Sequence, residues 1–222
     1  MLLSLALSIL LTLPPVTSAL PTIHFLSSRS APSAVSVLLQ IAPSSTSCAN
    51  ASYPSECATA SQAAPYLIST MATHNVTTAP ELAALLSLIA YESGEFQYNI
   101  NHFPTPGNPG QGTRNMQMAP YNLLYARSIP ALAAPLAKIT TASSTDGLTD
   151  DQLDAIRALV LPDDYTWGSA AWFLASQCAS IRPALQAGGQ DGWEAYLGCV
   201  GTAATSDRLA YWTSANQALG IS

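Results

Sequence analysis

Apolar residues recur at helical spacing along most of the chain. The clearest set shares the spacing i, i+3, i+4 and i+7: Leu82, Leu85, Leu86 and Ile89. Side chains with this spacing lie along one face of an α-helix. Pro80 suits the first turn of such a helix, and Gly94 suits its C-terminal end. Thr78 and Glu81, three residues apart, predict a capping box at its start.

Similar patterns predict helices in the rest of the chain. They comprise a short helix beginning near Pro65, residues 116–139 with interruptions at Pro130 and Pro135, a helix opened by a capping box of Thr149 with Gln152, and three helices within residues 167–185, 191–200 and 206–219. Residues 99–115 are dense in Asn, Pro and Gly, which predicts a long loop. No segment alternates with period two for long, so the predicted fold class is mainly α.

The N-terminal region predicts the compartment. Residues 2–13 form an apolar run that is too short to cross a bilayer as a helix, which needs about 20 residues. The small residues Thr17 and Ala19 then predict a signal peptide over residues 1–19, and hence a secreted, extracellular protein. Residues 20–47, rich in Ser, Ala and Pro, are either a propeptide or an extended arm, of which Val35–Ile41 could pack on the domain. We expect one domain over residues 48–222.

The composition limits the classes of molecule that we expect as binding partners. Only 9% of the residues are charged, with 7 basic against 13 acidic residues and a formal net charge of −6. No basic patch is available for a phosphate backbone, which argues against nucleic acid as a partner. No second long apolar run follows the N-terminal one, so we expect no membrane association, and we expect a monomer.

Four cysteines in a secreted chain predict two disulfides. Three connectivities are possible and the sequence does not choose among them; we predict the local pairs Cys48–Cys57 and Cys178–Cys199. The three histidines are scattered and the cysteines lack metal-site spacing, so we predict neither a metal nor another cofactor. Sequons at Asn50 and Asn75 predict a glycoprotein if the host is eukaryotic.

Glu92 is the first candidate for chemistry, because it ends the leucine-rich helix. At 100° per residue it lies about 20° from Leu85, at the edge of the apolar stripe. Partial burial and the negative end of the helix dipole both favour the uncharged carboxyl. A protonated carboxyl at the rim of a core is what a general acid for glycosidic bond cleavage requires. The alternative is a glutamate whose carboxylate reaches water past a frayed last turn.

The residues that follow add a second motif. Glu92 and Ser93 are followed by Phe96, then by the glycine-rich loop and by "NMQMAP" at residues 115–120. This order resembles the lysozyme-like superfamily, in particular soluble lytic transglycosylases and goose-type lysozymes, over roughly residues 78–126. The resemblance implies a lysozyme-like helical domain with a cleft.

The resemblance also implies roles for individual residues. Glu92 would be the catalytic proton donor, and Gln117 would line the cleft and bind the sugar, unless it caps the following helix. Ser93 would orient Glu92 or simply end its helix. The other substrate-binding candidates are neutral or aromatic residues near the loop and a later turn: Tyr98, Asn99, Tyr165 and Trp167. Asn101 would lie beside the same site; turn formation is the alternative role for both asparagines and is favoured more for Asn101 than for Asn99.

Two functions follow as hypotheses. The first is a secreted lysozyme-like or muramidase-like glycoside hydrolase that cleaves β-1,4 bonds in a polysaccharide, either peptidoglycan of bacterial cell walls or a chitin-like polymer. The second is a non-catalytic glycan-binding or interaction protein on the same scaffold, because fold alone does not fix function.

Overall fold

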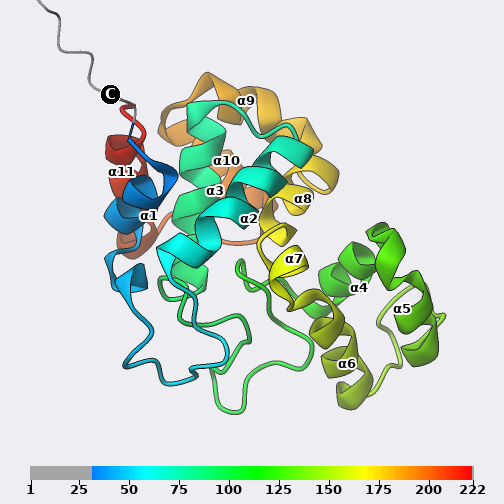
Figure 1. Ribbon diagram of the computed structural model, residues 1–222. Helices are drawn as coiled ribbons and strands as arrows, with labels where there is room; N and C mark the ends of the chain where they lie inside the picture. Colours follow the sequence, from blue (N-terminus) through cyan, green and yellow to red (C-terminus); the bar gives the residue numbers. More distant parts are fainter. Residues whose placement is uncertain (1–31, 222) are drawn as a thin grey trace, which may run out of the picture. The chain divides into compact units, whose positions relative to one another are not determined.

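The computed structural model describes residues 32–221, which form a mainly helical unit, as predicted (Figure 1). The predicted signal peptide and residues 20–31 of the predicted arm lie outside the described residues. The helices, in chain order, are α1 (Ala34–Ile41), α2 (Ala60–Thr73), α3 (Ala79–Glu92), α4 (Ala119–Ser128), α5 (Ala133–Ile139), α6 (Asp150–Val160), α7 (Asp163–Thr166), α8 (Ser169–Ser176), α9 (Arg182–Ala187), α10 (Gly189–Cys199) and α11 (Ser206–Ala218). Short 3-10 turns occupy Pro43–Thr46, Pro130–Leu132 and Ala179–Ile181.

Helix α3 forms the centre of the core. Its residues from 83 to 90 are all buried, and it packs against α1, α8, α9, α10 and α11. A helix that is apolar on every side is expected to be surrounded by other elements. The leucine stripe that predicted this helix is therefore only part of its buried surface. Its C-terminal end at Glu92 is fixed in position by the surrounding helices.

One helix start and one predicted cap differ from the predictions. Helix α2 begins at Ala60, because Thr59 and Gln62 form a complete capping box, and Pro65 lies inside the helix. The predicted capping box of α3 is wrong: Thr78 makes no side-chain bond to the helix backbone. Its hydroxyl instead donates to the carboxylate of Glu81 at 2.9 Å.

Of the other predicted helix boundaries, some are confirmed and some are wrong. Thr149 and Gln152 form the predicted capping box at the start of α6. Pro130 interrupts the helical segment after α4 as predicted, whereas Pro135 is accommodated within α5. The helix predicted within residues 167–185 is divided into α8, a 3-10 turn and α9.

The segment before Cys48 includes regular structure. Residues 34–41 form α1, capped by the Ser33 side chain, and Val37, Leu38 and Ile41 are buried in the core. The stretch that could pack on the domain therefore does so.

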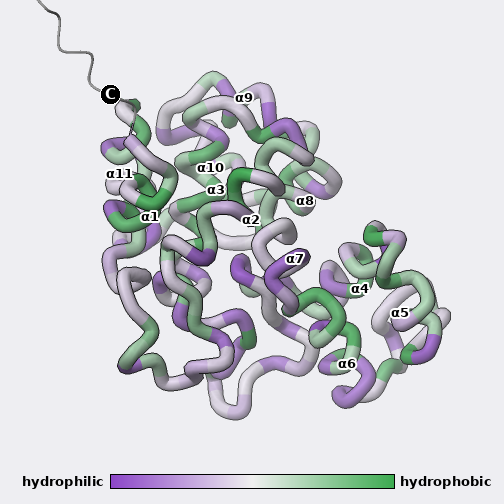
Figure 2. The backbone as a smooth tube through the Cα atoms, in the orientation of Figure 1, coloured by the Kyte–Doolittle hydropathy of each residue, from purple (hydrophilic) through white to green (hydrophobic). Residues whose placement is uncertain are grey.

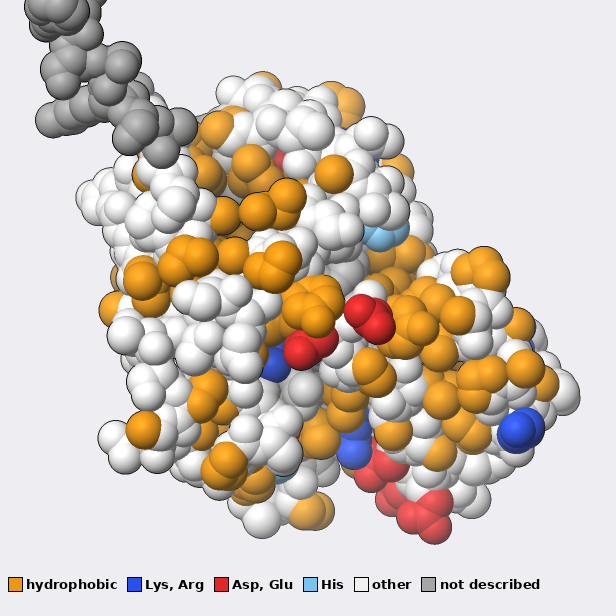
Figure 3. Space-filling model, in the orientation of Figure 1, with side chains coloured by type: hydrophobic (Ala, Val, Ile, Leu, Met, Phe, Trp, Pro, Cys, Tyr) orange, Lys and Arg blue, Asp and Glu red, His pale blue; other side chains and the backbone are white. Residues whose placement is uncertain are grey.

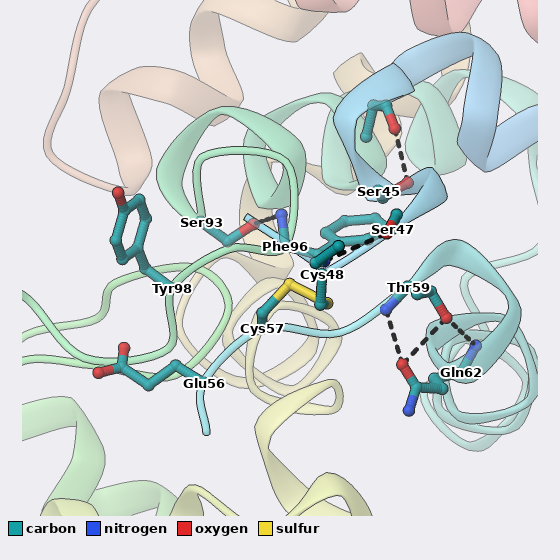
Figure 4. Close-up of a disulfide and its surroundings, with 12 residues drawn as sticks. Ser45, Ser47, Cys48, Glu56, Cys57, Thr59, Gln62, Ser93, Phe96 and Tyr98 are labelled. Carbon is teal, nitrogen blue, oxygen red and sulfur yellow. Dashed lines mark hydrogen bonds between the residues drawn. A yellow bond between two sulfur atoms is a disulfide. The ribbon is translucent and has the colours of Figure 1, made fainter. Parts of the chain in front are cut away.

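Both predicted disulfides, Cys48–Cys57 and Cys178–Cys199, are present. Figure 4 shows the first of them beside the turn of Ser93 and Phe96, which follows α3. In the described residues the asparagines of both sequons, Asn50 and Asn75, are exposed. None of the helices within residues 32–221 combines the length and apolar character that a membrane crossing needs.

Replacing both Cys178 and Cys199 with serine should lower the free energy of unfolding by about 3 kcal/mol, because the disulfide reduces the conformational entropy of the unfolded chain. The two cysteines are 21 residues apart and join the end of α8 to the end of α10. Urea unfolding followed by circular dichroism measures the change. An unchanged urea midpoint for the double variant would contradict a stabilising role.

Candidate functional site

A pocket of about 230 Å³ lies at the C-terminal end of α3. We call it the Glu92 pocket. Its lining residues are Leu88, Glu92, Gln111, Asn115, Met116, Gln117, Met118, Tyr121, Phe173, Val200, Gly201, Thr202 and Arg208. The fold thus brings Glu92 and Gln117 into one pocket, although a long loop separates them in sequence. Figure 2 shows this loop, residues 97–115, as mainly hydrophilic to neutral.

Glu92 is paired with a basic residue that the sequence patterns did not predict. The Arg208 guanidinium donates a hydrogen bond from Nη2 to Glu92 Oε1 at 3.0 Å, and the two side chains are 16% and 23% exposed. The same guanidinium lies 4.4 Å above the Tyr91 ring centroid. Arg208 is in the first turn of α11, where the helix dipole disfavours a positive charge. The unfavourable interaction of Arg208 with the helix dipole is offset by its contacts with Glu92 and Tyr91.

The charge of Glu92 also affects the pKa of a tyrosine in the core. Burial, together with the negative charge of Glu92, raises the pKa of the Tyr196 phenol well above its usual range. The Tyr196 phenol is therefore neutral at any physiological pH.

Gln117 provides an acceptor without a partner. Its Nε2 donates to Asn122 Oδ1 at 2.7 Å, and Asn122 Nδ2 in turn donates to the Gly110 carbonyl at 2.8 Å. These bonds fix the orientation of the amide, and Gln117 Oε1 is buried with no hydrogen-bond partner among residues 32–221. Buried polar atoms are normally satisfied, so an orphan of this kind needs an explanation. Gln117 is not the N-cap of α4, a position that Met118 occupies.

Arg114 holds the turn behind Glu92 in place. Its guanidinium is stacked 4.4 Å above the Trp167 ring and donates to the carbonyls of Phe96 at 2.9 Å and Glu56 at 2.7 Å. Burial lowers the pKa of Arg114 to about 10, partly offset by the charges of Asp163 and Glu56. Arg114 therefore stays charged at neutral pH and connects three segments of the chain.

Several predicted site residues lie outside the Glu92 pocket. Ser93 is fully buried; its hydroxyl donates to the Ile89 carbonyl and accepts from the Phe96 amide, which ends the helix. Tyr98 packs edge-on against Tyr53 and His102. The backbone N–H of Asn99 donates to the Glu56 carboxylate. Asn101 Oδ1 accepts from the backbone N–H of Asn108, which closes a turn. These four residues shape the loop next to the pocket.

Tyr165 and Trp167 border a different and larger cavity, of about 610 Å³, together with His74 and Asp163. Trp167 is 1% exposed, and its indole Nε1 donates to Asp163 Oδ1 at 2.8 Å. Its ring packs edge-on against Phe96. Trp167 is thus part of the core.

No second carboxylate joins Glu92 among the residues that line its pocket. Glu95, the nearest in sequence, has a positive φ of 59° and turns away. Its carboxylate accepts hydrogen bonds from the Tyr211 hydroxyl at 2.8 Å and from the Ser44 amide. The hydrogen bond and charge of Glu95 add to burial in raising the pKa of Tyr211 to about 12.

Comparison with known proteins identifies a relative in Fusarium oxysporum (strain Fo5176), a bifunctional dioxygenase (DOX)-epoxy alcohol synthase (EAS) that is 44% identical over 162 residues. The relative is an enzyme with two named activities. The match takes in 72% of this chain but only 12% of the relative, so the chain spans a small part of the length of the protein that it matches. No protein-family model matches the chain, and no solved structure matches it.

This finding overturns the predicted function. The relative is named as a dioxygenase and epoxy alcohol synthase, so the predictions of a glycoside hydrolase, of its glycan-binding alternative and of a polysaccharide substrate are wrong. The geometry offers a physical reason. Glu92 Oε1 accepts a hydrogen bond from the Arg208 guanidinium at 3.0 Å, so the carboxyl group has a cationic partner that the prediction did not include. The predicted aromatic residues Tyr165 and Trp167 do not line its pocket.

Dioxygen chemistry in proteins relies on haem, flavin, copper or non-haem iron. Iron and copper sites without haem need clusters of His, Cys or carboxylate ligands. Among residues 32–221, no group of three or more such side chains could hold a metal ion. Both disulfides use up the cysteines, and His102 is engaged by Glu56 at 2.7 Å. The donor set of the described residues therefore does not fit a non-haem metal centre.

Proposed function

We propose that this domain is a small-molecule-binding module and that its ligand is an uncharged, oxygen-bearing organic molecule of the epoxy alcohol class. The Glu92 pocket is the binding site. The observation that carries the proposal is the unpartnered, oriented acceptor Gln117 Oε1 in the same pocket as the Glu92–Arg208 pair.

The lining of the pocket supports an uncharged ligand. Glu92 and Arg208 are the two charged residues that line it, and they compensate each other. A charged ligand would have to break this ion pair or be repelled by the member of the pair that carries the same charge. A hydroxyl group, by contrast, can donate to Glu92 or to Gln117 Oε1, and an epoxide oxygen can accept from the guanidinium.

The remaining lining supports a ligand with a carbon skeleton. Leu88, Met116, Tyr121, Phe173 and Val200 supply apolar surface around these few polar groups. Ligand sites usually combine mostly apolar walls with a few placed polar atoms, at volumes of about 300–1,000 Å³. At about 230 Å³, the Glu92 pocket suits the oxygenated part of a molecule whose hydrocarbon part extends outward.

The Fusarium relative gives the ligand class. Its name assigns it the synthesis of an epoxy alcohol, and the segment that it shares with this chain is 12% of its length. A short segment with its own core and disulfides suits a module that binds such a compound, with oxygenation carried elsewhere in the long enzyme.

We also propose that the helical arrangement is lysozyme-like and that the protein is secreted. The position of Glu92 at the end of α3 and the presence of Gln117 in the same pocket support the first proposal. The two disulfides and the exposed sequon asparagines support the second. Neither proposal carries a glycosidase activity with it.

The test is calorimetric titration with a short, water-soluble epoxy alcohol. The unmodified chain should bind it saturably, and Glu92→Gln should bind it about tenfold or more weakly, because a hydrogen bond to a charged group contributes about 1.5–3 kcal/mol. Glu194→Gln is the matched control, since Glu194 is exposed on α10 and outside the pocket.

Two outcomes would contradict the proposal. One is equal affinity of the Glu92→Gln and Glu194→Gln variants for the epoxy alcohol. The other is equal affinity of the unmodified chain for the epoxide that lacks the hydroxyl, because the proposal assigns that hydroxyl to Glu92 or Gln117.

A further inference from the structure

A second concave surface lies between α1, α2 and the N-terminal half of α3. We call it the α1–α2 groove; its volume is about 380 Å³. Helix α3 presents Leu82 and Leu86 to it, whereas Leu88 and Glu92 line the Glu92 pocket. The two sites thus share no lining residue. Figure 3 shows hydrophobic side chains gathered over α1 and α2 on this face of the molecule.

The groove is almost wholly apolar. Its walls include Val37, Leu38, Leu67 and Met71, which are buried or nearly so, and its rim includes Ile68, which is 59% exposed. Among residues 32–221, no Asp, Glu, Lys or Arg lines it. Concave, mostly apolar surfaces of this kind are typical of sites for small molecules. The absence of charge selects an uncharged occupant, since burying an unpaired charge there would be costly.

The size of the groove selects a small occupant. Thirteen residues line it, whereas a stable protein interface takes about 20–30 residues from each partner. Its volume falls within the range of about 300–1,000 Å³ that small-molecule sites occupy. Met71 adds an unbranched, adaptable side chain that can follow the shape of a flexible ligand.

We propose that the α1–α2 groove is a binding site for a linear hydrocarbon chain, such as the alkyl part of an uncharged amphiphile. Its apolar walls provide affinity through the hydrophobic effect, and Thr77 at its edge provides a hydroxyl for a polar end group. The inference stands apart from the proposed function, because it uses a separate surface and no atom of the Glu92 pocket.

A series of straight-chain primary alcohols, from butanol to decanol, tests the proposal. Their dissociation constants for the full chain are measured by calorimetry. Affinity should rise about fourfold with each added methylene, which corresponds to about 0.8 kcal/mol, and level off when the groove is full. Affinity that does not depend on chain length would overturn the proposal.

The site is located with Ile68→Asp, which places a charge at the exposed rim without altering the core. Decanol binding should weaken at least tenfold, and Ile68→Asn should give a smaller loss that excludes misfolding as the cause. Leu124→Asp is the control, because Leu124 is 40% exposed on α4 and outside the groove. Unchanged decanol binding by Ile68→Asp would overturn the proposal, as would sedimentation of the unmodified chain as a dimer that this variant dissociates.

The two proposals fail separately. Loss of epoxy alcohol binding by Glu92→Gln with normal decanol binding supports the Glu92 pocket as the epoxy alcohol site. The same result supports a separate site for decanol. Normal epoxy alcohol binding by Ile68→Asp together with lost decanol binding supports two independent sites.

Discussion

Replacing Arg182 with methionine is expected to lower the free energy of unfolding by about 3–5 kcal/mol, because it leaves a buried carboxylate without its partner. Glu81 is completely buried in the first turn of α3, and its Oε1 accepts from Arg182 Nε at 2.7 Å and from Gln186 Nε2 at 3.0 Å. The Arg182 guanidinium also donates to the Asn75 carbonyl at 2.7 Å. Arg182 therefore joins α9 to the turn between α2 and α3.

The chain offers a matched control in Arg157→Met. Arg157 pairs with Asp154 at 3.0 Å, but the Asp154 side chain is 47% exposed. An ion pair with one partner in water typically contributes about 0–1 kcal/mol. Chemical unfolding of both variants should separate them by several kcal/mol. Equal losses of unfolding free energy in the two variants would show that the burial of Glu81 does not determine the destabilisation caused by Arg182→Met.

Replacing Trp167 with alanine is expected to cost about 3–5 kcal/mol of unfolding free energy, because it opens a large cavity in the core. The indole ring packs against Phe96 and under the Arg114 guanidinium, and both of these residues position the turn after Glu92. Loss of the ring should therefore also loosen this turn, which thermal unfolding and hydrogen exchange at the Phe96 amide would detect.

Tyr53→Ala is the control for this variant. Tyr53 is an aromatic residue that is 41% exposed and stacks on His102. Its removal should change the stability by no more than about 1 kcal/mol, as is usual away from the core. A stability change for Trp167→Ala as small as that of Tyr53→Ala would contradict the assignment of Trp167 to the core.

The helical architecture was predictable because its signals are local. Leucine spacing, Pro80 and Gly94 located α3, and Thr149 with Gln152 located the start of α6. Where a prediction was wrong, a distant residue was responsible. Glu81 was assigned to a capping box, but Arg182, about one hundred residues later, binds its carboxylate. Such long-range pairs leave no periodic pattern in a single sequence.

The candidate site was predictable in the same partial way. Glu92 and Gln117 lie in one pocket, as the two motifs implied. Arg208, which determines the charge of the pocket, lies 116 residues beyond Glu92 and belongs to no motif. One signal could have suggested it, because arginine in the first turn of a helix opposes the helix dipole and needs a compensating acid.

The predicted function failed for a related reason. The resemblance covered residues 78–126, whereas Val200–Thr202 and Arg208 form another part of the pocket lining. A motif defines the type of a residue but not its partners, and the partners decide whether a carboxyl group acts as an acid or as an acceptor.

The most direct test of the ligand assignment is nuclear magnetic resonance of the nitrogen-15-labelled chain during titration with the epoxy alcohol. The side-chain signals of Gln117 Nε2 and Arg208 Nε should shift in proportion to saturation, while the exposed amide of Gln190 on α10 stays fixed. Saturable binding that leaves the Gln117 and Arg208 signals unmoved would contradict the account.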